Sequence, residues 1–162
     1  MFHTQEKRLV RLLQPIECVR DDAWLGNGYY FWEDIQNATM WGNMAKRNTG
    51  YFEIYKALID CENVLDTVFN EEHYRFWLNQ IQKVAVEIKQ KTGLKATLKQ
   101  VNSYFKEKGI WNEVTGIYFQ DFSNDENATL VYRFVYKKRV QLVVYDLSII
   151  TTFGLTTTRS VK

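Results

Sequence analysis

The residues best suited to chemistry lie in the segment 25–34, which contains Gly26, Gly28, four consecutive aromatic residues and the acidic pair Glu33 and Asp34. Glycines let a backbone approach a ligand closely or adopt positive φ, and exposed aromatic faces provide stacking surfaces. A segment of this composition suits a flat ring, such as a nucleobase or a nicotinamide. The same pattern is typical of a tight turn that leads into a buried strand, and both interpretations are open at this point.

Four helices are predicted from the spacing of apolar residues and from capping residues. The clearest is amphipathic, because apolar residues from Tyr74 to Ile88 recur at helical spacing, and this stripe is expected to belong to the core. Thr97 followed by Gln100 is a capping-box pattern that predicts the start of a shorter helix, which Gly109 ends. The predicted helices cover residues 4–13, 33–46, 71–91 and 97–109.

Segments rich in β-branched and aromatic residues gather mainly in the last third of the chain. The predicted strands cover residues 51–59, 114–120, 130–136 and 140–147. Helices followed by clustered strands predict an α+β fold with an antiparallel or mixed sheet. Because the sequence has no evident linker and no internal repeat, residues 1–162 are expected to form a single domain.

The composition limits the classes of partner that can be expected. Of 162 residues, 46% are hydrophobic, which is enough for a sizeable core, and a net charge of +2 gives no general reason to expect nucleic acid or a membrane. Cys18 and Cys61 are far apart and have no neighbouring histidine, so reduced thiols are expected rather than a metal site or a disulfide. No apolar run is long enough to cross a bilayer, and a cytoplasmic protein is expected.

Several separated segments follow one another in a characteristic order. His3-Thr4 comes first, and a Gly-x-Gly-x-Tyr-Phe-x-acidic block comes next, followed by an apolar strand over 52–60 and a closing strand over 141–147. This order resembles that of the ADP-ribosyltransferases, in the branch with a His-Tyr-Glu signature that includes poly(ADP-ribose) polymerases and many bacterial toxins. Thr4 stands in place of that family's glycine after the histidine. The block is made by Gly26, Gly28, Tyr30, Phe31 and Glu33.

The resemblance implies a fold and a set of roles. The fold is an ADP-ribosyltransferase-like split β-sheet core with flanking helices and with the NAD cleft between the two halves. Tyr30 and Trp41 would clamp the nicotinamide, backbone groups near Thr4 would bind its carboxamide, and His3 would hydrogen-bond the adenosine ribose. Ala38 falls where many members carry a serine. The residues implied to bind NAD are His3, Thr4, Gly28, Tyr30, Ala38 and Trp41.

Gln141 occupies the position of the family's catalytic glutamate, which makes His3, Tyr30 and Gln141 the implied catalytic set. A glutamine can hydrogen-bond, but it carries no charge and cannot accept a proton as a base. Elongation to poly(ADP-ribose) is therefore not expected. Three explanations remain: an enzyme that transfers one unit to an already nucleophilic acceptor, a degenerate binder, or a glutamate deliberately replaced to tame a toxic activity.

Other acidic residues and one histidine are weaker candidates. Glu113, Asp121 and Asp125 are candidates for the missing base, with Glu113 the first to test, although turns and strand ends often carry such residues for solvation. His73 is expected on a solvated helical face and is given no role.

A lysine-rich segment is a candidate contact surface for nucleic acid. Residues 83–108 contain seven lysines and two glutamates, and Asn102, Tyr104 and Trp111 lie in or near the same region. Lysines bind phosphates and aromatic rings stack on bases, but a solvated helical face explains the same pattern.

The resemblance implies a mono-ADP-ribosyltransferase that uses NAD as a substrate. Its acceptor would be a protein or a nucleic acid, and a toxin or antiphage effector with a neutralising antitoxin would be a natural context. The alternatives are a catalytically silent module that binds NAD, ADP-ribose or nucleic acid, and an NAD glycohydrolase in which water is the acceptor.

Overall fold

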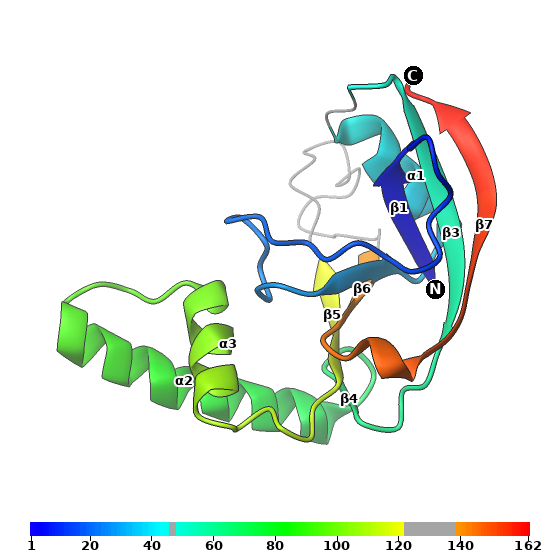
Figure 1. Ribbon diagram of the computed structural model, residues 1–162. Helices are drawn as coiled ribbons and strands as arrows, with labels where there is room; N and C mark the ends of the chain where they lie inside the picture. The colour runs from blue at the N-terminus through cyan, green and yellow to red at the C-terminus, as the bar shows by residue number, and fades with distance from the viewer. Residues whose placement is uncertain (46–47, 122–138) are drawn as a thin grey trace, which may run out of the picture.

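The computed structural model describes residues 1–45, 48–121 and 139–162, and it has an α+β fold (Figure 1). The described residues form one mixed sheet in the order β4-β5-β6-β2-β1-β3-β7. Only β4 and β5 pair in parallel, and the other neighbours are antiparallel. The strands are β1 (Phe2–Glu6), β2 (Tyr29–Trp32), β3 (Tyr51–Ile59), β4 (Val64–Asp66), β5 (Gly116–Asp121), β6 (Arg139–Val144) and β7 (Ile150–Ser160). The helices are α1 (Ile35–Met44), α2 (Glu71–Thr92), α3 (Leu98–Glu107) and the 3-10 turn η2 (Leu147–Ile149). The predicted α+β class with a mixed sheet is therefore confirmed.

The junction between β1 and β2 divides the sheet into two parts. These strands pair at one position, where Phe2 lies opposite Trp32. On either side of the junction the ladders are longer, since β1 pairs with β3 at five positions and β2 pairs with β6 at four. Figure 1 shows β1, β3 and β7 running at a steep angle to β2. The sheet is therefore held together least by backbone pairing at this junction.

The helix ends are fixed by local side-chain contacts. The Asp34 carboxylate accepts a hydrogen bond from the backbone N–H of Gln36, which caps α1. At the start of α3, Thr97 and Gln100 form the predicted capping box. Gly93 ends α2 with φ of 72°, a conformation that glycine adopts at little cost. A capping box lies within a few residues of the helix end, which is why the sequence could reveal the one at Thr97.

Three groups of buried side chains hold the layers together. Phe105 and Trp111 belong to a group that packs α2 and α3 against β5 and β6. A second group contains Ala38 and Phe52 and packs α1 against β1, β2 and β3. A third group lies between β2, β3, β4 and β6 and includes Phe31 and Leu142. Figure 1 shows α1 beside β1 and β3, and the α2–α3 pair at the opposite end of the molecule.

Several sequence-based expectations about the elements need correction. The predicted helix over 4–13 is wrong, because residues 2–6 form β1 and Leu9 and Leu13 are exposed rather than packed. The apolar stripe of α2 is mostly half-buried, with Tyr74 exposed and only Val84 fully buried. The strands β4 and β7 were not predicted. The predicted strand over 130–136 lies outside the described residues.

The remaining predicted elements agree with the structure within a few residues. The strand over 51–59 matches β3, and those over 114–120 and 140–147 correspond to β5 and β6. The helices over 33–46, 71–91 and 97–109 correspond to α1, α2 and α3. In the parts of the chain that the structure describes, none of the helices has the combined length and hydropathy of a membrane span.

Candidate functional site

A cleft of about 850 Å³ brings together five of the predicted site residues, which come from distant parts of the sequence. The segment 16–24 forms one wall, while β1, β2, β5, β6 and the end of α1 supply the others. Its volume is within the range of about 300–1,000 Å³ that is usual for small-molecule sites. The predicted residues that line it are His3, Thr4, Tyr30, Trp41 and Gln141.

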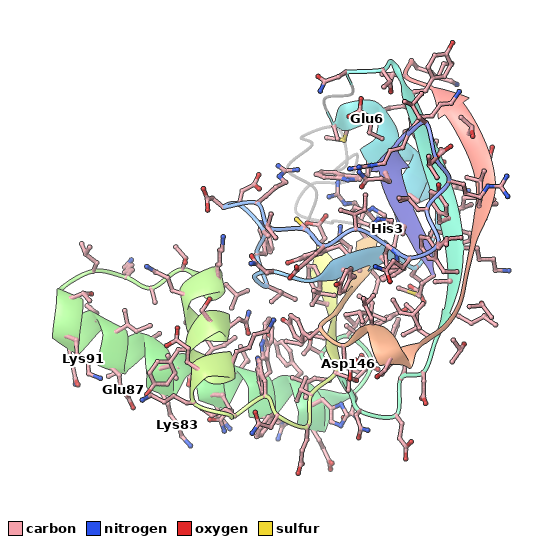
Figure 2. The ribbon with its side chains drawn as sticks, viewed as in Figure 1. His3, Glu6, Lys83, Glu87, Lys91 and Asp146 are labelled. Carbon is pink, nitrogen blue, oxygen red and sulfur yellow. The ribbon has the colours of Figure 1, made fainter. Side chains whose placement is uncertain are left out.

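His3 connects the two parts of the sheet at the cleft. Its side chain is buried, and Nδ1 lies 2.9 Å from the backbone oxygen of Tyr30. Because a carbonyl oxygen only accepts hydrogen bonds, Nδ1 carries the proton and donates. The ring centroid lies 5.5 Å from that of Phe31 and 6.1 Å from that of Phe153. Figure 2 shows His3 in the middle of the molecule, so this residue fixes β1 relative to β2 where backbone pairing is sparse.

The Tyr30 hydroxyl fastens a turn, while the ring lines the cleft. The hydroxyl donates to the backbone oxygen of Gly26 at 2.8 Å and accepts from the backbone N–H of Leu25 at 3.2 Å. The Tyr145 hydroxyl donates to the oxygen of Leu25 at 2.9 Å, and Gly26 supplies the positive φ of 81° that the turn requires. Burial raises the pKa of both phenols, which therefore stay protonated as donors. Residues 25–28 thus form the tight turn that the sequence allowed, and the strand that follows this turn also contributes Tyr30 to the cleft.

Trp41 lies beside a second tryptophan and a cation. The rings of Trp41 and Trp32 are 6.4 Å apart with an interplanar angle of 49°. The Arg20 guanidinium lies over the Trp41 ring at 5.6 Å from its centroid, and Asp22 holds it through hydrogen bonds of 2.8 and 2.5 Å. A guanidinium at this distance is attracted by the negative face of the indole. Trp32, Arg20 and Asp22 all line the cleft, and sequence reasoning gave none of them a role.

Gln141 lies in β6 between two aromatic side chains. Its register partners are Trp32 in β2 and Phe119 in β5, and all three line the cleft. One register step along the same face, Asp121 of β5 is opposite Arg139 of β6, and their side chains form an ion pair. The cleft therefore holds a carboxylate close to the neutral Gln141 amide.

Thr4, Ala38 and Gly28 have mainly structural contacts. The Thr4 hydroxyl donates to the backbone oxygen of Ala38 at 2.8 Å, which ties β1 to α1. Ala38 is fully buried, and neither it nor Gly28 is among the residues that line the cleft. A Cβ at Gly28 would lie 2.6 Å from the side chain of Val143, so this glycine is needed for close packing against β6.

Of the other acidic candidates and His73, only Asp121 lines the cleft in the part of the chain that the structure describes. Glu113 is exposed and does not line the cleft, whereas Asp121 does. Asp121 therefore replaces Glu113 as the first candidate for the missing base. Asp125 lies outside the described residues. His73 is not purely solvated, because its Nδ1 accepts a hydrogen bond from the backbone N–H of Asp66 at 3.1 Å.

The lysine-rich region offers less of a nucleic-acid surface than its sequence predicts. Trp111 is buried and donates to the buried Asn102 side chain at 3.2 Å, so this ring cannot stack on bases. Lys106 donates to the backbone oxygen of Asn27 at 3.2 Å. Figure 2 shows Glu87 between Lys83 and Lys91 along one side of α2, so a carboxylate reduces the positive charge of that face.

Comparisons with known proteins identified no relative, since no family, curated protein or solved structure was found to match this chain.

Cys18 and Cys61 are free thiols, with Cys18 on the wall of the cleft. Across the described ranges, no three His, Cys, Asp or Glu side chains gather closely enough to hold a metal ion.

Proposed function

We propose that this protein is an NAD-dependent mono-ADP-ribosyltransferase whose substrate lies in the cleft between the two parts of the sheet. The observation that carries this proposal is the convergence of His3, Thr4, Tyr30, Trp41 and Gln141 on one cleft. These residues were predicted from the resemblance of the sequence to a family pattern, and they come from β1, β2, α1 and β6. A division of the sheet at the β1–β2 junction is what an ADP-ribosyltransferase-like fold would require, and we include that fold in the proposal.

The aromatic side chains suit the nicotinamide end of NAD. The nicotinamide ring of NAD is flat and positively charged, and the Trp41 face already attracts a flat cation, the Arg20 guanidinium. In the proposal the nicotinamide occupies a comparable position against Trp41, in the cleft that Tyr30 also lines. Holding the dinucleotide in this way orients the bond between nicotinamide and ribose toward the acceptor.

The reaction needs little covalent participation by the protein. The bond from the nicotinamide nitrogen to ribose C1′ breaks, its electron pair leaves with nicotinamide, and C1′ passes through a cation-like state before the acceptor bonds to it. Gln141 can hydrogen-bond a ribose hydroxyl but cannot hold a negative charge beside C1′. We therefore assign Gln141 to orientation, which is consistent with transfer of a single unit.

Gln141 also favours a second candidate function, a silent module that binds NAD or ADP-ribose without turnover. Both functions predict NAD in the same cleft, and they differ in the release of nicotinamide. Water as the acceptor would make the protein an NAD glycohydrolase, with nicotinamide release but no labelled macromolecule.

The proposal is tested by incubating cell extract or purified nucleic acids with NAD labelled in its adenosine part. The native sequence is compared with Gln141→Glu and His3→Ala, with circular dichroism to verify folding. A transferase labels a protein or a nucleic acid and loses this activity with His3→Ala. Label with Gln141→Glu alone would identify a silenced form, and absence of both label and free nicotinamide in every sample would refute the transferase proposal.

A further inference from the structure

The Asp121–Arg139 ion pair lies inside the cleft, where it forms part of the wall. The two side chains are 13% and 14% exposed, so this pair is far less solvated than the Arg20–Asp22 pair, whose side chains are 67% exposed for Asp22 and 55% for Arg20. Withdrawing charges from water is unfavourable, and packing alone would be served as well by apolar residues of similar size. A carboxylate and a guanidinium that are largely buried in a cleft wall therefore need an explanation beyond stability.

The β5–β6 register places Asp121 near Gln141, the position where the resemblance implies a glutamate that this chain lacks. Gln141 is opposite Phe119, and Asp121 is two residues beyond Phe119 on the same face of β5. Diagonal neighbours on one face of a sheet are typically about 7–8 Å apart, which is within the span of a bound ribose and its acceptor. Arg139 is also held by Trp32, whose ring centroid lies 5.5 Å from the guanidinium carbon. Its Nε atom is buried and finds no hydrogen-bond partner among the described residues.

We propose that Asp121 is the general base of this cleft and supplies the carboxylate that Gln141 lacks. This inference rests on the proposed function and extends it to the acceptor, which would be a hydroxyl or a similar neutral group that must lose a proton. As the acceptor oxygen bonds to ribose C1′, the bond to nicotinamide breaks and its electron pair leaves with nicotinamide. The acceptor's proton passes to the Asp121 carboxylate. Arg139 is a positioning residue whose ion pair keeps Asp121 in the wall of the cleft.

The test measures transfer and NAD affinity separately in four forms of the full chain. These are the native sequence, Asp121→Asn, Asp121→Glu and the double variant Asp121→Asn with Gln141→Glu. Affinity is measured by quenching of tryptophan fluorescence with NAD, and transfer with labelled NAD and the acceptor found for the native protein. The matched control is Glu71→Gln, which removes the carboxylate of an exposed ion pair with Arg75 on α2, away from the cleft.

Loss of a general base typically slows a reaction by about 100-fold or more. We expect such a loss with Asp121→Asn, while NAD affinity stays within about 3-fold and Glu71→Gln is unchanged. Asp121→Glu should retain part of the activity, and the double variant should recover it, because Gln141→Glu returns a carboxylate to the cleft. Recovery would not follow from a purely structural role for Asp121, and it also separates loss of the base from loss of folding.

Two results would overturn the inference, and they can be told apart. Full transfer by Asp121→Asn, with the native protein active, would show that the acceptor needs no base from this residue and would leave the proposed function standing. A native protein that neither transfers ADP-ribose nor releases nicotinamide would remove the proposed function, and this inference with it.

Discussion

The hydroxyl of Tyr30 should stabilise the wall of the cleft, and the change Tyr30→Phe isolates its contribution. The substitution keeps the ring and removes the hydrogen bonds to Leu25 N–H and the Gly26 oxygen. Both partners belong to buried residues, so their polar groups lose a partner without gaining water. Leaving such groups unsatisfied costs about 1–3 kcal/mol. For a chain of this size that corresponds to a fall in melting temperature of about 2–12 °C.

Urea denaturation followed by circular dichroism measures this loss, with Tyr104→Phe as the matched control. The Tyr104 hydroxyl donates to the exposed Glu87 side chain, so the loss of this hydrogen bond should cost no more than about 0.5 kcal/mol. Equal free energies of unfolding for the two variants would refute the anchoring role. Tyr30→Ala is a poorer probe of the site, since the half-buried Tyr30 ring packs against the core, and removing an aromatic side chain from a core costs about 3–5 kcal/mol, which threatens the fold itself.

The same phenol predicts a pH dependence. Burial raises the pKa of Tyr30 and Tyr145 above the usual value of 10.0, so the unfolded chain releases these protons at lower pH than the folded protein does. Stability from this source is complete below about pH 10 and is lost as the pH rises above it. Denaturation curves at increasing pH should show this loss, with a smaller slope in Tyr30→Phe. An identical slope in that variant would contradict the assignment.

Three further predictions concern α1 and the cleft. Asp34→Ala should lower the free energy of unfolding by about 0.5–2 kcal/mol in urea denaturation through loss of the α1 cap, while Asp34→Ser retains most of it. Gly42→Ala should destabilise the protein by about 1–3 kcal/mol in the same assay, despite better helix propensity, because its Cβ would lie 2.3 Å from the buried Phe52 ring. Gln141→Glu should raise nicotinamide release, measured by chromatography, and an unchanged or lower rate would argue against a position beside ribose C1′.

Local signals explain which parts of the fold could be predicted from the sequence. The capping box at Thr97 and the apolar run of β3 act over a few residues, and both were located correctly. A helix was wrongly predicted over residues 4–13 because the spacing of the leucines there suits a helix. Residues 2–6 instead form a strand, since they gain backbone partners from β3, about fifty positions away. Strand pairing at such a distance leaves no periodic mark in the sequence.

The candidate site shows the same division between local and distant causes. His3, Tyr30, Trp41 and Gln141 could be proposed because their order along the chain resembles a family pattern. Asp121 could not be preferred to Glu113, because only the β5–β6 register and its ion pair with Arg139 place it in the cleft. The wall over 16–24 was also unpredictable, since it depends on the Tyr30 and Tyr145 hydroxyls that fix the turn after it.

The most direct test of the central claim, that NAD occupies this cleft, is an NMR titration of protein carrying ¹⁵N-labelled tryptophan. The indole N–H signals provide their own control, because Trp24, Trp32 and Trp41 line the cleft while Trp77 and Trp111 pack in the α2–α3 group. Addition of NAD should shift the first three signals and leave the other two in place. Unchanged signals at saturating NAD, or shifts confined to Trp77 and Trp111, would contradict the claim.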